Sequence, residues 1–186
     1  MKNETFSPFP VVALSKRLFF PAVKCLEVYT LHGVFTLNEH LSGSTVWTIG
    51  TSDRTADEFI SILKELGVNV AVDVRRFPTS KFEWFKGENL KKLLADAGIE
   101  YVHLEGLGGY RSGGYRKHME SEVFREAFKE LLELVKGNKV AIFCSEKLFF
   151  KCHRRFIADE LTRKGVKVIH VVEKGKTQVH RLAGHD

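Results

Sequence analysis

The chain has 186 residues, of which 44% are hydrophobic, so it can bury one sizeable core, and its length favours one domain over two. The formal net charge of +6 favours polyanionic or phosphate-bearing partners, although many basic proteins bind no nucleic acid. Three cysteines, with Cys25 far from the other two, argue against a secreted disulfide framework, and we expect reduced thiols in a cytoplasmic protein.

Residues 1–44 are expected to form an N-terminal extension or arm, separate from a domain at residues 45–186. Pro8, Pro10 and Pro21 interrupt the apolar runs of this segment. No uncharged run in it approaches the roughly 18 to 20 residues that a membrane span requires, and it lacks the cleavage site of a signal peptide. We expect the arm to pack on the domain or to contact a partner, and we expect no membrane association.

From residue 45 onward, strand and helix patterns alternate along the chain. TVWTIGTS is β-branched and apolar, and the next helix begins with Thr55 and Glu58 at capping-box spacing. In chain order we expect a strand at 45–52, a helix at 55–67, a strand at 68–76, a helix at 87–98, a strand at 99–104, a helix at 120–136, a strand at 139–144, a helix at 152–165 and a strand at 166–172. Because the strands are apolar on both faces, this order predicts an α/β fold: a single three-layer domain with a mostly parallel five-stranded sheet and helices on both faces.

The polar residues that follow the strands form the candidate site. Right-handed crossovers bring the carboxyl ends of parallel strands to one edge, where open α/β sheets bind ligands. The opposite strand ends are reached through short generic turns, so we expect a pocket at the carboxyl edge. We expect chemistry from Asp73, Glu146, Cys152 and His153, and ligand binding from Ser52, Arg75, Tyr110, Arg111, Cys144 and Arg154.

Several blocks of this sequence resemble the DUF488 family, in the same order along the chain. They are TIGTSDRTADEFISILKELGVNVAVDVRRFP, FKGENLKKLLADAGIEYVHLEGLGG, CSEK and CHRR, and the resemblance runs from about Val46 to about Val172. It implies an α/β domain and no established reaction, with family-typical residues at Asp73, Arg75, Cys144, Glu146, Cys152, His153 and Arg154. Where the family usually reads TIGHSN this chain reads TIGTSD, so a mechanism that needs an imidazole at position 51 is not available to it.

The arginines of these loops suggest an anionic ligand. A guanidinium such as that of Arg75 or Arg154 matches phosphate in a bidentate fashion, and the N-terminus of the last helix adds backbone donors. A phosphate-bearing ligand, either a nucleotide or the end of a nucleic acid, is therefore the expected class. The alternative is that the arginines pair with acidic side chains of the same loops, namely Asp53, Asp73 and Glu146.

Cys152 is the candidate nucleophile. It lies at the start of the last predicted helix beside His153 and two arginines, a setting that lowers the pKa of a thiol. A nucleophilic or redox role would then use His153 or Glu146 to exchange the proton. The sequence lacks the Cys-x5-Arg loop of thiol phosphatases and rhodaneses, because positions 150 and 158 are Phe and Ala. The alternative is that Cys144 and Cys152 are buried packing residues.

Metal ligation and a disulfide are further alternatives. Cys144, Cys152 and His153 could supply three zinc ligands, with His103 or His118 as the fourth. The eight-residue gap between the cysteines is not a zinc-knuckle spacing, and a disulfide is not favoured in a reducing compartment. Asp73 and Glu146 could instead bind Mg²⁺ or act as an acid and base, or simply pair with arginines. We expect no cofactor.

Two loops that combine aromatic and basic residues border the same edge, at residues 75–87 and 106–118. They could close over a ligand or stack on bases, or they could be ordinary connectors. The sequence therefore leaves two classes of function. The first is an enzyme with hydrolase-type or transferase-type chemistry on a phosphorylated or nucleotide-like substrate. The alternative is a non-catalytic nucleic-acid or nucleotide binding module with structural cysteines.

Overall fold

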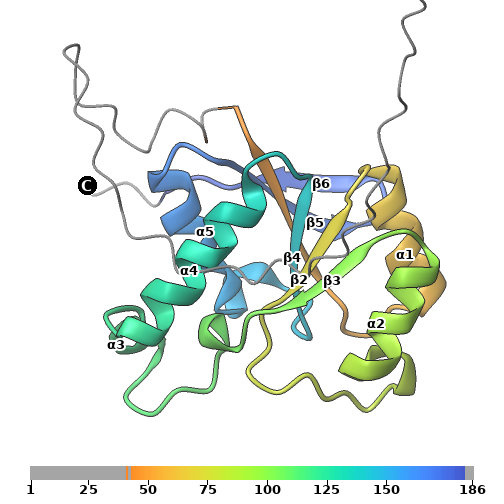
Figure 1. The fold of residues 1–186 in the computed structure, drawn as a ribbon, viewed down its shortest axis with the longest axis horizontal. Coiled ribbons are helices and arrows are strands. Elements are labelled where there is room, and N and C mark those ends of the chain that lie inside the picture. The colour runs from red at the N-terminus through yellow and green to blue at the C-terminus, as the bar shows by residue number, and fades with distance from the viewer. Residues whose placement is uncertain (1–40, 42, 183–186) are drawn as a thin grey trace, which may run out of the picture. The chain divides into compact units, whose positions relative to one another are not determined.

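The structure, a computed structural model, describes residue 41 and residues 43–182 (Figure 1). The arm expected at residues 1–44 lies almost entirely outside the described residues, and so does Cys25. Within the described part, no helix is both long enough and apolar enough to cross a membrane.

One six-stranded sheet, with the order β3-β2-β4-β1-β5-β6, organises the described residues. The first five strands are parallel, as predicted, and the sixth pairs antiparallel with the fifth. The sixth strand was not predicted, because KTQV is a short edge strand whose residues are all exposed and carry no apolar signal. The strands are β1 (Thr45–Gly50), β2 (Val70–Asp73), β3 (Glu100–His103), β4 (Val140–Cys144), β5 (Lys167–Glu173) and β6 (Lys176–Val179).

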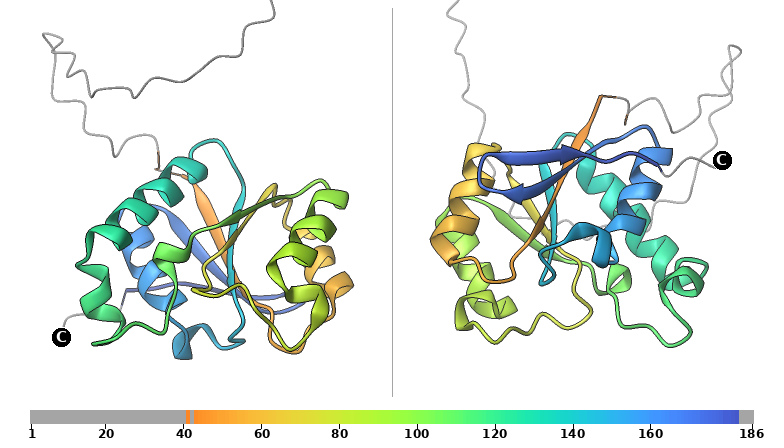
Figure 2. Two further views of the ribbon diagram at one scale, coloured as in Figure 1. Left: turned by 60° about the horizontal axis from the view of Figure 1, so that its bottom comes forward. Right: turned by 180° about the vertical axis from the view of Figure 1, so that it is seen from behind.

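Helices cover both faces of the sheet, which confirms the predicted three layers (Figure 2). The longer helices are α1 (Ala56–Glu65), α2 (Gly87–Asp96), α4 (Glu122–Val135) and α5 (Arg154–Arg163). Helices α1 and α2 pack on one face through residues such as Phe59 and Leu90. Helices α4 and α5 pack on the other face through residues such as Leu131 and Ile157. Each face therefore has its own apolar cluster.

The helix boundaries follow from local signals. Thr55 caps α1 by accepting a hydrogen bond from the backbone N–H of Glu58 at 3.1 Å, as the capping-box spacing predicts. The glycine-rich stretch at 106–118, predicted as a loop, contains a short helix α3 (Tyr115–Met119). Helix α5 begins at Arg154, two residues later than predicted, so Cys152 lies in extended backbone just before the helix.

The carboxyl ends of β1 and β4 lie side by side at the centre of the sheet, with Gly50 opposite Cys144. The chain leaves β1 towards the α1/α2 face and leaves β4 towards the α4/α5 face. Such a divergence is the topological switch point at which α/β sheets bind ligands. Here the backbone that follows Cys144 crosses directly over the end of β1, and a Cβ on Gly50 would lie 2.2 Å from the carbonyl oxygen of Glu146. Glycine at position 50 permits this close approach.

Candidate functional site

The alternation of side chains at the ends of β2 and β4 places the predicted site residues Asp73 and Cys144 on opposite faces of the sheet. Asp73 and Arg75 follow Ala71 on the α1/α2 face, where they lie against Phe143. Cys144 lies on the α4/α5 face, in the same apolar cluster as Cys152. The residues around Asp73 and those around Cys144 thus share an edge of the sheet but form two separate groups.

Asp73 and Arg75 form a buried ion pair. The side chains are 0% and 4% exposed, and the Asp73 carboxylate receives the Arg75 guanidinium at 2.5 to 3.1 Å. Arg75 also donates to the carbonyl oxygens of Thr79 and Phe85. Burial, and then the Asp73 charge, raise the pKa of Tyr101, so its hydroxyl stays protonated and donates to Asp73 at 2.8 Å. The salt-bridge alternative for Arg75 is the arrangement that the structure contains.

The second group surrounds the sulfur of Cys152. The Sγ atoms of Cys144 and Cys152 and a ring nitrogen of His153 all lie within 4.8 Å of one another. The Nε of Arg154 donates to the Cys152 sulfur at 3.4 Å. Both cysteines are buried, and within the part of the chain that the structure describes neither forms a disulfide. We call these four residues, Cys144, Cys152, His153 and Arg154, the thiol cluster.

His153 is held in one orientation by a backbone carbonyl. Its Nε2 lies 2.7 Å from the carbonyl oxygen of Val74, which can only accept, so Nε2 carries the proton. Burial lowers the pKa of His153, so the ring is neutral at pH 7 and Nδ1 is unprotonated. Nδ1 lies 3.7 Å from the Cys152 sulfur, where it can accept a proton. A Cβ on Gly109 would lie 2.9 Å from this Nδ1, so glycine there leaves room for the ring.

The pKa values of the two cysteines are shifted in opposite directions, and that of Cys152 is the lowered one. The hydrogen bond from the Cys144 thiol lowers the pKa of Cys152, and Arg154 lowers it further through its charge and its donors, against the opposing effect of burial. The same hydrogen bond, together with burial, raises the pKa of Cys144, which therefore keeps its proton. We assign the charge to Cys152 because Arg154 donates to that sulfur and not to the sulfur of Cys144.

Arg154 is fixed by several acceptors and is 1% exposed. Its Nη2 donates to the carbonyl oxygens of Glu146 and Lys147, and its Nη1 lies 3.5 Å from the Oγ1 of Thr48. The guanidinium is thus committed to protein groups and to the thiolate. Its positive charge stabilises an anion that belongs to the protein itself.

The other predicted residues lie outside the thiol cluster. Glu146 is exposed, and its carboxylate accepts from the backbone N–H of Leu148 at 3.0 Å. Ser52, with φ of 36°, donates its backbone N–H to Ser145. Tyr110 is 92% exposed, and Arg111 donates to carbonyl oxygens of its own loop. The polar side chain beside the Cys152 sulfur is therefore His153 and not Glu146.

Three residues could hold a metal ion, namely Cys144, Cys152 and His153. His103 and His118, the predicted fourth ligands, instead place their Nε2 atoms against the carbonyl oxygens of Arg75 and Gly106. The guanidinium of Arg154 at 3.4 Å from the Cys152 sulfur opposes a dication at that atom. Among the described residues, Asp73 and Glu146 belong to no cluster of three potential ligands. The ligand set for a metal ion in this cluster is therefore three residues, without the predicted fourth histidine.

Part of the aromatic loop at residues 75–87 packs into the apolar core. Phe85 is fully buried against Phe59, with the ring centroids 5.5 Å apart. Phe82 and Trp84 stack on each other, while Phe77 is 59% exposed. A hollow of about 530 Å³ lies at this side of the carboxyl edge, with Tyr101 of β3 and residues of the loop such as Pro78 and Glu83 in its wall.

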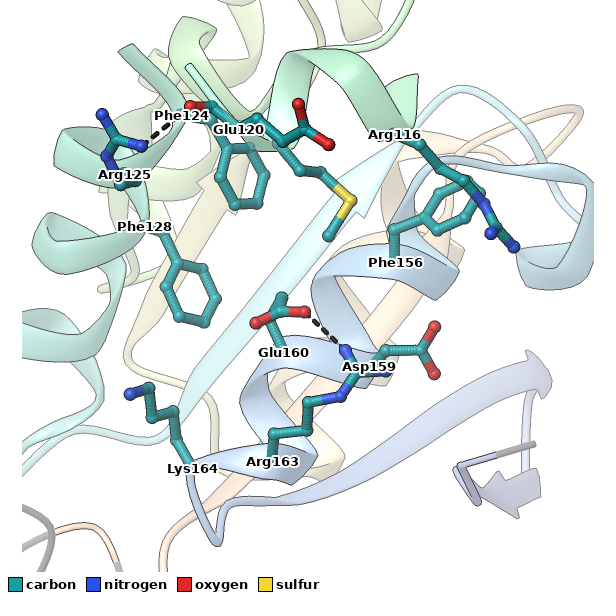
Figure 3. Close-up of a pocket in the computed structure, with 11 residues that line it drawn as sticks. Arg116, Glu120, Phe124, Arg125, Phe128, Phe156, Asp159, Glu160, Arg163 and Lys164 are labelled. Carbon is teal, nitrogen blue, oxygen red and sulfur yellow. Dashed lines mark hydrogen bonds and ion pairs between the residues drawn. The ribbon is translucent and has the colours of Figure 1, made fainter. Parts of the chain in front are cut away.

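A larger groove lies away from the predicted residues, between α3, α4 and α5 (Figure 3). Its volume is about 710 Å³, its floor includes Phe124, Phe128 and Phe156, and none of the ten predicted site residues lines it. Figure 3 shows charged side chains on its rim, among them Asp159 and Arg163.

Four polar residues near the cluster were not predicted, and they are Thr48, His170, His180 and Asp159. Thr48 and His170 lie in central strands and are both fully or almost fully buried. A buried polar residue needs a hydrogen-bond partner. The hydroxyl of Thr48 and the imidazole of His170, each within an apolar strand, could therefore have indicated buried hydrogen bonds. Their partner could not be read from the sequence, because 122 residues separate them.

The fold and the thiol cluster define an α/β protein with a buried cysteine, histidine and arginine site at the carboxyl edge of a parallel sheet. The chain belongs to the DUF488 family, described as a domain of unknown function, whose sequence model matches residues 55–161. The matched segment contains the whole thiol cluster and the Asp73 ion pair. Neither a search of curated proteins nor a search of solved structures found a match to the chain.

Proposed function

We propose that this protein is an enzyme that uses the Cys152 thiolate as a nucleophile. One observation carries the proposal: the Cys152 sulfur lies between a donor, the Arg154 Nε at 3.4 Å, and an acceptor, the His153 Nδ1 at 3.7 Å. Nucleophile, base and an orienting group for the base are the recurring parts of thiol catalysis, and the orienting group here is the carbonyl of Val74.

The cluster supports chemistry of the hydrolase or transferase type. The thiolate would attack an electrophilic atom of the substrate, and His153 would take a proton from the water or acceptor that later releases the intermediate. A phosphate-bearing substrate stays a prediction, because Arg75 and Arg154 already have protein partners. The burial of Cys152 supports an enzyme over an open nucleic-acid binding face.

We expect the alkylation of Cys152 by iodoacetamide to show a pH midpoint below that of an ordinary thiol, because the Cys144 thiol and Arg154 lower the pKa of Cys152. The thiolate fraction, and with it the alkylation rate, should rise as the pH rises through this value. A Cys25→Ser background and peptide mapping would assign the modified residue. A midpoint at the ordinary thiol value of about 8.5 would contradict the proposal.

Cys144 provides the matched control for that titration. In Cys144→Ser the hydroxyl can still donate to the Cys152 sulfur, so the midpoint should stay low. In Cys144→Ala this donor is lost, and the midpoint should rise. Equal midpoints in the two variants would show that Cys144 does not lower the pKa of Cys152, and Arg154 would then be the main cause of the lowered value.

A second candidate function is a dithiol redox couple, and the distance of no more than 4.8 Å between the two Sγ atoms favours it. Hydrogen peroxide would oxidise the Cys152 thiolate to a sulfenic acid, and the Cys144 thiol would then displace water to form a disulfide. Intact-mass measurement after peroxide treatment should show the loss of two hydrogen atoms. The Cys144→Ala variant should stop at the sulfenic acid, which dimedone traps. Retention of both free thiols under peroxide would contradict the redox candidate.

A further inference from the structure

We infer that a chain of four hydrogen-bonded side chains positions the Arg154 guanidinium against the Cys152 sulfur. In order from the helix surface to Arg154, its members are Asp159, His180, His170 and Thr48. We call these four residues the buttress chain. The inference rests on the proposed function, because it assigns the chain a role in setting the reactivity of the same thiol.

The contacts of the buttress chain are continuous. Asp159 Oδ1 lies 2.9 Å from His180 Nε2, and His180 Nδ1 lies 2.9 Å from His170 Nε2. His170 Nδ1 lies 2.7 Å from Thr48 Oγ1, which in turn lies 3.5 Å from Arg154 Nη1. Both ring nitrogens of each histidine are therefore used.

With both histidines neutral, the direction of every hydrogen bond in the buttress chain follows from its two ends. A guanidinium can only donate and a carboxylate can only accept. Asp159 therefore accepts from His180 Nε2–H, which leaves His180 Nδ1 as an acceptor for His170 Nε2–H. His170 Nδ1 then accepts the Thr48 hydroxyl proton, and the Thr48 oxygen is free to accept from Arg154. With both histidines neutral, all four bonds are satisfied in one arrangement.

The tertiary structure holds the middle of the buttress chain rigidly. Thr48 and His170 are direct partners in the parallel pairing of β1 and β5, and they are 0% and 1% exposed. Phe149 stacks on the His170 ring with the centroids 3.6 Å apart. Burial, and then the neighbouring His180 and Arg154, lower the pKa of His170 to about 3, so the ring is neutral at pH 7.

The two ends of the buttress chain lie in different surroundings. The side chain of Asp159 is 27% exposed and borders the groove of Figure 3. Without the Thr48 hydroxyl, the Arg154 Nη1 would lose an acceptor, while its Nη2 would keep the carbonyl oxygens of Glu146 and Lys147. The guanidinium would then be held less firmly, and the contact of its Nε with the Cys152 sulfur would weaken. Several titratable or charged groups lie around Cys152 and influence its pKa or that of the neighbouring His153, namely Cys144, His153, Arg154, Arg111 and Tyr115. Of these, the buttress chain contacts only Arg154.

The test is the pH midpoint of Cys152 alkylation in the full-length Cys25→Ser protein, measured with iodoacetamide. Thr48→Val keeps the side-chain shape and removes the hydroxyl, so we expect the midpoint to rise by about 0.5 to 1 pH unit, as for one lost hydrogen bond. Thr48→Ser restores the hydroxyl and should restore the midpoint. Asp159→Ala, at a partly exposed position that tolerates substitution, should raise the midpoint by a smaller amount.

Two residues of α5 supply matched controls. Thr162 has a buried hydroxyl with no hydrogen-bond partner among residues 41 and 43–182, so Thr162→Val removes a hydroxyl without touching the buttress chain. Glu160→Ala removes the neighbouring carboxylate, which pairs with Arg163. In both control variants, the pH midpoint of Cys152 alkylation should equal that of the parent protein. Folded Thr48→Val and Asp159→Ala variants that also titrate like the parent would overturn the inference.

A second readout separates this inference from the proposed function. Nitrogen-15 NMR of the parent protein should find His170 and His180 both protonated at Nε2, and Asp159→Ala should change the tautomer or the shift of His180. If the histidines behave in this way while Cys152 titrates as an ordinary thiol, the proposed function fails and the buttress chain stands as a structural feature only. If the alkylation midpoint of Cys152 is low but the histidines carry the other tautomer, the inferred role of the buttress chain is wrong and the proposed function survives.

Discussion

Replacing Arg75 by methionine is expected to lower the free energy of unfolding by about 3 to 5 kcal/mol, because it leaves the Asp73 carboxylate buried without its cation. Asp73 is 0% exposed, and Tyr101 would remain as its side-chain donor. The carbonyl oxygens of Thr79 and Phe85 would also lose their guanidinium donor. Urea unfolding at pH 7, followed by circular dichroism, measures the change.

Two further variants make this prediction specific. Asp73→Asn in combination with Arg75→Met should be less destabilised than Arg75→Met alone, because no charge is left buried. Glu133→Gln breaks the surface pair of Glu133 with Lys136, and we expect a change of no more than about 1 kcal/mol. A loss in Arg75→Met as small as the loss in Glu133→Gln would show that the buried pair contributes little.

Replacing Gly50 by alanine is expected to cost about 3 kcal/mol or more, or to prevent folding. The new Cβ would lie 2.2 Å from the carbonyl oxygen of Glu146 and 2.6 Å from the Cα of Lys147, and backbone atoms cannot turn aside as a flexible side chain can. Residues 146 and 147 supply the carbonyl oxygens that hold Arg154. Any Gly50→Ala protein that folds should therefore also show a raised alkylation midpoint for Cys152.

Gly98→Ala is the control for this substitution. Gly98 has φ of 75°, and no atom of the described residues lies within 4 Å of the position that a Cβ would take. The change therefore adds only left-handed backbone strain of about 1 to 2 kcal/mol. The urea midpoints of the two variants should differ clearly. Equal losses in Gly50→Ala and Gly98→Ala would indicate that the crossing over β1 relaxes at little cost.

Much of the fold could be predicted because its signals are local. The apolar runs, the Thr55 cap and the glycines that end the helices each act within one or two turns of chain, and the structure contains the five strands and the four longer helices that they predict. The edge of the sheet that carries the polar residues followed from the parallel order alone. Strand β6 was missed because its residues are exposed on both faces and show no apolar alternation.

The division of the site could not be predicted, because strands that are buried on both faces give no sign of which residue faces which layer. Asp73 and Cys144 both end apolar strands, yet one points to α1 and α2 and the other to α4 and α5. The face of the sheet on which an arginine lies decides which protein groups are close enough to bind it, and thus whether it is left free for a ligand. Arg75 meets Asp73, and Arg154 meets backbone carbonyls and the Cys152 sulfur.

The amino-acid sequence by itself determined the α/β class, the order of the elements, the family and the presence of a cysteine beside a histidine and arginines near a helix start. Only the tertiary structure decided that Cys152 meets Cys144 and that Thr48 lies beside His170, since both contacts depend on strand order and register. Those depend in turn on how helices pack across the whole sheet, which no local pattern encodes.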